Sequence, residues 1–282
     1  MNRFFTYLFL VTLFLMMAHG CSCVRGDNGT GEVTLASDSI VEQSAFKKSN
    51  GEMCHMKVNV IISYPSSYKD SATVEQLQQL YNSLILKAPG KMSQVKDALK
   101  LYAQSLIGRD VPVQAGATRA STDTIPADFD EIDIDSIESL IDVKVVYNNN
   151  SIITFCREET IKKNNVMTSV SHQYVNIDLE SMKRIGLSDL FRDDCLDQVT
   201  QSLKRQLMND KDVSNEDELN DIGYFNLPNL TVTGNFFFTP DGVTWSYDPS
   251  VVAVASVGVP TINIDYDDLK NYKCDNSLLD RF

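Results

Sequence analysis

Histidine is scarce in this chain of 282 residues, which contains only His19, His55 and His172. A hydrolytic triad or a histidine-rich zinc site needs such side chains close together, and this composition offers almost none for either. His172 lies in a run of alternating polar and apolar residues, where a hydrogen-bonded or half-exposed strand residue is the simpler interpretation. The sequence therefore argues against histidine-dependent catalysis.

Positive charge and phosphate-binding loops are also in short supply. Lys and Arg number 25 against 38 Asp and Glu, a formal net charge of -13, whereas nucleic acids and anionic lipids need clustered cations. The glycines at 26, 29 and 31 follow no strand pattern, as a phosphate loop would require. The acids at 130, 131, 133 and 135 lack the glycine and late glutamate of a calcium loop. We expect no nucleic-acid partner, no metal ion and no cofactor.

The amino terminus has the pattern of an export signal. Arg3 precedes an apolar run over residues 4–18 that is too short to span a bilayer comfortably. The run ends in Ala18-His19-Gly20-Cys21, which resembles the lipobox at which a bacterial cysteine is acylated and the chain is cleaved. We predict a lipoprotein signal peptide at 1–20 and lipidation at Cys21. Cys23 is the rival site, and a plain secreted protein or an uncleaved anchor are the alternatives.

The expected location follows from this signal. A lipid-anchored chain would lie in the cell envelope, at the outer membrane or the cell surface, facing the periplasm or the exterior. Residues 21–52 are rich in small and polar residues without periodicity, so we predict a flexible tether there.

Beyond the tether the remaining cysteines are Cys54, Cys156, Cys195 and Cys274. An even number in an oxidising compartment is compatible with two disulfides, and segment order suggests Cys54 with Cys156 and Cys195 with Cys274. Four cysteines allow three pairings, and reduced, buried thiols are an equally good interpretation. No pair has metal-ligand spacing.

Hydrophobic periodicity predicts an α+β fold, with an antiparallel sheet and helices packed on it. The expected strands cover 56–64, 143–147, 152–156, 170–178, 236–239, 243–247 and 261–265. Helices are expected from 74 to 85 behind Ser71 or Thr73 as cap, over 92–106, over 195–208 and, briefly, over 266–269. A polar excursion at 108–133 and a charged connection at 210–221 complete the pattern.

Three groups of residues in the carboxy-terminal half resemble domain-of-unknown-function family 3298. They are Asn176, Asp178, Leu179 and 187–191; Asn235, Phe236, Asp241 and Gly242; and Tyr247, Pro249, Ala253, Gly258, Ile264, Tyr266 and Leu269. The segment from Met56 onward resembles the companion amino-terminal domain, family 4163. On this basis we predict an amino-terminal α+β domain at 53–165 and a carboxy-terminal one at 166–282.

The resemblance implies recognition at the cell envelope. Related domains include the sensor of lysozyme-responsive anti-sigma factors and a non-catalytic region of peptidoglycan deacetylases. Two family motifs are missing, because residues 164–168 replace a Gly-Gly-Ala-His-Gly loop and 250–255 replace Tyr-Glu-Ile-Ala-Pro-Tyr. We therefore expect a non-enzymatic binding module for a protein or cell-wall glycan, without carrying over lysozyme binding.

Aromatic residues offer one candidate ligand face. Phe237, Trp245 and Tyr247 could stack on sugar rings or peptides. Alternation puts Phe236 and Phe238 on one side of the strand and Phe237 on the other, so at least one of the two faces must be core. The competing function is a hydrolase acting on envelope glycan, which needs two carboxylates facing across a cleft. The acids near 130–135 could supply them, but a solvated acidic loop is the simpler interpretation.

Overall fold

The computed structural model describes residues 32–47, 52–107 and 134–282. The expected signal peptide, Cys21 and Cys23 lie outside these ranges, as does the expected excursion at 108–133. The acids at 130, 131 and 133 are likewise outside. Among the described helices, none has the length and apolar character needed to cross a membrane.

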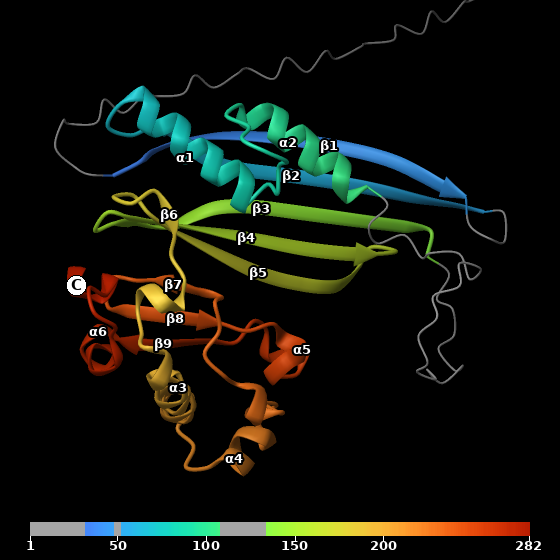
Figure 1. The fold of residues 1–282 in the computed structure, drawn as a ribbon. Coiled ribbons are helices and arrows are strands. Elements are labelled where there is room, and N and C mark those ends of the chain that lie inside the picture. Colours follow the sequence, from blue (N-terminus) through green and yellow to red (C-terminus); the bar gives the residue numbers. More distant parts are fainter. Residues whose placement is uncertain (1–31, 48–51, 108–133) are drawn as a thin grey trace, which may run out of the picture. The chain divides into compact units, whose positions relative to one another are not determined.

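A six-stranded sheet forms the larger layer (Figure 1). Its strands, in their spatial order, are β1 (Thr34–Lys47), β2 (Met53–Ser67), β3 (Ser136–Asn149), β4 (Ile152–Lys163), β5 (Val166–Asp178) and β6 (Lys183–Arg184). Neighbours are antiparallel except β2 and β3, which run parallel. Parallel neighbours need a crossover, and the helices between β2 and β3 supply it.

Two helices cover one face of this sheet, α1 (Ser71–Leu84) and α2 (Val95–Leu106). On β2 the even-numbered side chains from Cys54 to Ile62 are buried, while most odd-numbered ones are exposed. This period of two directs one side of the strand toward the helices. Leu77 and Tyr81 of α1 and Tyr102 of α2 are buried against it. The apolar faces of the two predicted helices therefore pack in the core. The predicted α+β class, with helices packed on the sheet, is confirmed.

The cap of α1 differs from the prediction. Asp70 is the N-cap, and its carboxylate accepts a hydrogen bond from the Thr73 amide at 2.9 Å. An aspartate at this position satisfies a backbone N–H that the first helical turn leaves unpaired. The expected caps, Ser71 and Thr73, are the first and third residues of the helix instead.

Tight asparagine turns join β3 to β4 and β4 to β5. Asn150 and Ser151 both have positive φ, as do Asn164 and Asn165. Two consecutive residues of this kind match the twist of an antiparallel hairpin, and asparagine tolerates the conformation. The expected domain boundary at 165 and 166 thus falls within the β4–β5 hairpin. The described residues form one compact unit.

A second sheet of three antiparallel strands follows, in the order β7 (Phe236–Phe238), β8 (Gly242–Ser246) and β9 (Thr261–Asp265). The helices of this part are α3 (Leu196–Asp210), α4 (Glu216–Asp221), α5 (Pro249–Val252) and α6 (Tyr266–Leu269). Short 3-10 turns occupy 187–189, 193–195, 227–229, 255–257, 270–272 and 278–281. The charged connection expected at 210–221 therefore contains a helix, whose cap Asn215 accepts from the Glu218 amide.

The expected tether is wrong over most of its carboxy-terminal part, because residues 34–47 form β1. Ile40, Glu42 and Phe46 alternate with more exposed residues, and the strand pairs with β2 along its whole length. The sequence pattern did not reveal this strand, because only one of its faces is partly buried and the residues on the other face are mostly polar. Pairing with β2 along its whole length holds it in the sheet, together with Leu35, Ile40 and Phe46, which pack against the core.

The predicted disulfides do not form. The sheet register places Cys156 opposite Lys144 of β3, close to the level of Ile62, so Cys54 lies about nine residues farther along β2, roughly 30 Å away. Cys156, Cys195 and Cys274 are free thiols. This agrees with the alternative interpretation that such cysteines are reduced and buried, except that Cys274 is only partly buried.

Candidate functional site

The predicted aromatic ligand face is wrong, because Trp245 is buried. Its side chain is 0% exposed and packs among the rings of Phe191 and Phe236, with centroids 6.1 and 6.2 Å away. Tyr247 is also buried, and its hydroxyl donates to the carbonyl of Thr231. These rings form the carboxy-terminal core and cannot contact a ligand.

Phe237 points to the other side of β7, as alternation predicted, and remains partly exposed. Its ring stacks on Tyr174 of β5 with centroids 4.4 Å apart. The ring therefore joins the two sheets, and a single partly covered aromatic does not make a sugar-stacking platform.

The polar residues that carry the family resemblance have structural roles. The Asn235 carboxamide accepts from the Tyr174 amide and donates to the carbonyls of His172 and Ser246. Asn176, buried on β5, donates to the Phe236 carbonyl at 2.7 Å and accepts from the Thr154 hydroxyl. These amides connect the outer edge of β5 to β7 and β8.

Asp178 ends β5 in a dense set of hydrogen bonds. Its carboxylate accepts from the Ser181 hydroxyl and from Arg281 at 2.8 Å. Burial acts to raise the pKa of Asp178, but the hydrogen bonds from Arg281 and Ser181 outweigh it and hold that pKa below its usual value. A hollow of about 210 Å³ beside it is lined by Lys183 and Asp189 among others. Since Asp178 is already saturated with partners, we interpret this region as a structural joint.

Titratable groups also gather where β3, β4 and β5 lie side by side. Glu158 is 3.1 Å from the Lys144 ammonium and 3.6 Å from Nε2 of His172. Cys156 lies two residues before Glu158 on β4, and burial raises the pKa of its thiol. A nucleophilic cysteine needs a lowered pKa, so this cluster holds no activated nucleophile. Among the described residues, no group of three or more His, Cys, Asp or Glu is placed to hold a metal ion.

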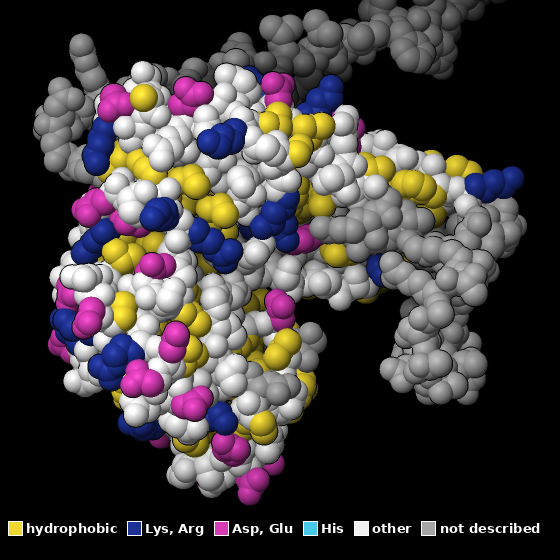
Figure 2. All heavy atoms as spheres, viewed as in Figure 1, with side chains coloured by type: hydrophobic (Ala, Val, Ile, Leu, Met, Phe, Trp, Pro, Cys, Tyr) yellow, Lys and Arg dark blue, Asp and Glu magenta, His cyan; other side chains and the backbone are white. Residues whose placement is uncertain are grey.

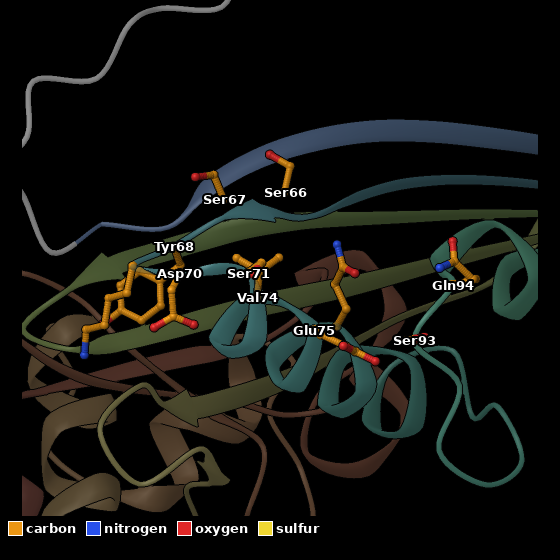
Figure 3. A pocket seen from close by; sticks show the side chains of 11 residues that line it. Ser66, Ser67, Tyr68, Asp70, Ser71, Val74, Glu75, Ser93 and Gln94 are labelled. Atoms are coloured by element: carbon orange, nitrogen blue, oxygen red, sulfur yellow. The ribbon is translucent and has the colours of Figure 1, made fainter.

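A second hollow, polar and of about 500 Å³, lies around the start of α1. Its walls are the end of β2, the first turns of α1 and the residues before α2 (Figure 3). Eleven residues line it: Ser66, Ser67, Tyr68, Lys69, Asp70, Ser71, Val74, Glu75, Gln78, Ser93 and Gln94. Figure 3 shows Ser66 and Ser67 on one side of the helix, with Ser93 and Gln94 at another. The volume falls within the roughly 300–1,000 Å³ of ligand sites.

Several polar groups of the hollow already have partners. Gln78 donates to the Pro65 carbonyl at 2.8 Å, and Ser66 donates to the Thr34 carbonyl. The Lys69 ammonium lies over the ring of Tyr68. These contacts hold the walls in place, because each ties a lining residue to the sheet or to its neighbour.

Other lining groups are available to a ligand. Within the described chain, the side chains of Ser67, Ser93 and Gln94 make no hydrogen bond with protein. Gln94 is the N-cap residue of α2, but its side chain makes no capping hydrogen bond. Glu75 is exposed, and its carboxylate accepts a long hydrogen bond of 3.4 Å from the Gln79 carboxamide. The hollow thus offers hydroxyl, amide and carboxylate groups on a rigid frame.

The charge state of the hollow follows from its geometry. The hydrogen bond from the Thr73 amide lowers the pKa of Asp70, so this carboxylate is ionised at neutral pH. A general acid for glycoside cleavage needs a raised pKa instead. Figure 2 shows acidic and basic side chains interspersed across the face in view, without one continuous basic patch.

Sequence reasoning missed this hollow. Its residues come from a strand end, a helix start and an interhelical turn, separated by up to 28 positions between Ser66 and Gln94. One local signal was present, since the segment from Ser66 to Ser71 is unusually rich in serine. That run lies between the predicted strand and the predicted helix, and only the fold brings Ser93 and Gln94 to it.

Comparison with known proteins supports the family resemblance. The family model described as "Protein of unknown function (DUF3298)" matches residues 188–267. No curated protein matches the sequence significantly.

Two solved structures share the fold. A member of the DUF3298 family from Bacteroides fragilis NCTC 9343 is 20% identical with a TM-score of 0.64, covering 89% of this chain and 98% of that one. A DUF3298 family protein from Pseudomonas aeruginosa PAO1 is 12% identical with a TM-score of 0.54, covering 87% and 97%. The matched segment includes Asp189, Asn235 and Trp245. Residues 188–267 are therefore a DUF3298 domain, in a chain whose described fold resembles solved members of that family.

Proposed function

We propose that this protein is a non-enzymatic recognition module of the cell envelope, which binds glycan in the polar hollow at the start of α1. The single observation that supports this is the hollow itself, about 500 Å³ and lined by serine, glutamine and acidic side chains. Sugars present many hydroxyl groups, and a site rich in such donors and acceptors can pair with them directly.

The rigidity of the site supports binding. Ser66 and Gln78 are tied by hydrogen bonds to the backbone at Thr34 and Pro65, while Ser67, Ser93 and Gln94 remain open. A preformed site loses less conformational entropy when a ligand binds, because its walls are already ordered.

The competing hydrolase would use Asp70 and Glu75, which line the same hollow. Asp70 is committed to capping α1, and its lowered pKa suits a carboxylate rather than an acid. A binding role therefore fits the chemistry of the hollow better. Glu75 is the residue on which a hydrolytic role would depend.

The test is binding of soluble cell-wall oligosaccharides to the full chain, measured by titration calorimetry. We expect Gln94→Ala and Ser67→Ala to weaken binding about tenfold, roughly the value of one or two lost hydrogen bonds. Gln76→Ala is the matched control, since Gln76 is exposed on α1 but does not line the hollow. Absence of binding, or equal weakening by the control, would refute the proposal.

Hydrolysis is tested on the same samples. We expect no release of reducing ends from the glycan, and we expect Glu75→Gln to retain binding. Glycan cleavage that Glu75→Gln abolishes would establish the hydrolase instead.

The envelope location is part of the proposal and rests on residues 1–21. We propose a signal peptide at 1–20 and a lipid on Cys21, with the segment from Met56 onward as the companion of the family 3298 region. Replacing Cys21 with serine should release the chain from membranes and abolish acylation. Retention and acylation of that variant would identify Cys23 as the anchor.

A further inference from the structure

The outer edge of β1 is long and open. β1 is the last strand on its side of the sheet, and its 14 residues contain no proline. Figure 1 shows it at the border of the sheet, with α1 and α2 over the face. Such an edge presents a row of backbone N–H and C=O groups that can pair with another strand.

The opposite edge of the same sheet is covered over the carboxy-terminal part of β5. β6 covers the end of β5 with only Lys183 and Arg184, a short, charged pair. Nearer the middle of β5, the Asn235 carboxamide accepts a hydrogen bond from the Tyr174 amide and donates one to the His172 carbonyl. A neighbouring strand would make the same kind of hydrogen bonds. Proteins commonly protect sheet edges in these ways. β1 has no comparable cover among the described residues.

Two hydrogen bonds establish which residues of β1 face outward. The His55 amide donates to the Asp135 carbonyl. The backbone N–H and C=O groups of odd-numbered residues of β2 therefore point toward β3, and those of even-numbered residues point toward β1. Since Val60 pairs with Ile40, even-numbered residues of β1 bond to β2. The Ser39 amide is consistent with this direction, because it donates to the half-buried Asp38 carboxylate and not to β2. The outward backbone groups therefore belong to Ser37, Ser39, Val41, Gln43 and Ala45.

We propose that β1 pairs with β1 of a second copy of this chain, antiparallel and centred on Val41. A two-fold axis at Val41 places every outward residue opposite another one: Val41 opposite Val41, Ser39 opposite Gln43 and Ser37 opposite Ala45. Both strands then overlap along nearly their full length, since Val41 lies at the middle of 34–47. A two-fold contact of this kind is closed, so it forms a dimer and not a fibre.

Charge selects this register over its neighbours. Centring on Ile40 would place Asp38 directly opposite Glu42, and centring on Glu42 would place two copies of Glu42 together. Like charges directly opposite each other destabilise a strand pair. In the register centred on Val41, Asp38 faces Ser44 and Glu42 faces Ile40. Val41 itself is 52% exposed, an apolar side chain that the partner would cover.

Sedimentation of the full chain over a range of concentrations tests the proposal. We expect a reversible dimer, and we expect Val41→Lys and Val41→Glu each to raise its dissociation constant about tenfold, because each puts like charges together at the axis. Mixing the two variants should restore association, since Lys then faces Glu. Val166→Lys is the control: it adds the same charge at an exposed site on β5, on the opposite side of the sheet.

Three results would overturn the proposal. A chain that is monomeric at every concentration would do so, as would dimerisation that Val41→Lys leaves unchanged. A mixture of the two charged variants that stays monomeric would exclude the register centred on Val41.

Discussion

The two halves of the described chain use their polar and aromatic side chains in opposite ways. In the carboxy-terminal half, Trp245 and Tyr247 are buried, and the Asn235 carboxamide makes three hydrogen bonds to backbone. In the amino-terminal half, the hollow beside α1 and the edge of β1 leave polar groups open. The resemblance to family 3298 lies in the carboxy-terminal half, and the surfaces available for recognition lie in the amino-terminal half. The residues that carry the family resemblance therefore stabilise the fold and do not line the candidate binding site.

Among the variants that test this contrast, Trp245→Ala has the largest expected effect on stability. Emptying the space of a fully buried indole should lower the free energy of unfolding by about 3–5 kcal/mol, because packing and transfer energy are both lost. Denaturant unfolding followed by circular dichroism measures it, with the exposed Val251→Ala as control. A loss below about 1 kcal/mol would mean that Trp245 is not core.

Asn235→Ala tests the joint between the sheets. The change leaves the Tyr174 amide and the His172 carbonyl without their partner, which should cost about 1–3 kcal/mol of stability. Asn220→Ala, at an exposed position on α4, should be nearly neutral. If both variants unfold at the same denaturant concentration, Asn235 does not carry the joint.

Asp178→Asn gives a pH-dependent loss of similar or smaller size. The pKa of Asp178 is lowered in the folded chain, so its contribution is complete above the unfolded value of about 4 and is lost as pH falls through the folded pKa. The stability gap between the wild type and Asp178→Asn should therefore be constant near neutrality, about 1–3 kcal/mol, and close under acid. A gap that widens as pH falls would have the wrong sign. Urea unfolding from pH 2 to 7 measures it.

The smallest effect concerns the thiols of the two halves. In a chain with Cys21 and Cys23 replaced by serine, a reductant should leave the melting temperature unchanged, because no disulfide joins Cys195 to Cys274. A thiol reagent should label Cys274 before the buried Cys156 and Cys195. A reductant-dependent drop in melting temperature would restore the disulfide prediction.

Local sequence patterns predicted secondary structure correctly where the residues of a single element determine its conformation. The last strand and helix, 261–265 and 266–269, have the predicted bounds, and the alternation of Phe236, Phe237 and Phe238 is as expected. β3 and β4 run farther than predicted, because their outer parts carry charged residues such as Glu138 and Lys162 on the uncovered face. A strand covered on one face needs apolar residues at only half its positions.

The candidate site could not be predicted in the same way. Ser67 and Gln94 share the hollow only because α1 and α2 return across the sheet between β2 and β3. The aromatic prediction failed for the related reason that a composition suited to binding is equally suited to a core. Burial decides between these roles, and burial is a property of the packed chain.

Residue order alone determined the secondary structure of the amphipathic segments, the asparagine turns and the resemblance of the carboxy-terminal half to its family. These depend on side-chain periodicity and backbone preferences that act over a few residues. Tertiary structure alone decided that Trp245 is core, that 34–47 is an edge strand and that polar groups from three segments meet at α1. Each of these depends on which surfaces cover one another, and distant parts of the chain provide that cover.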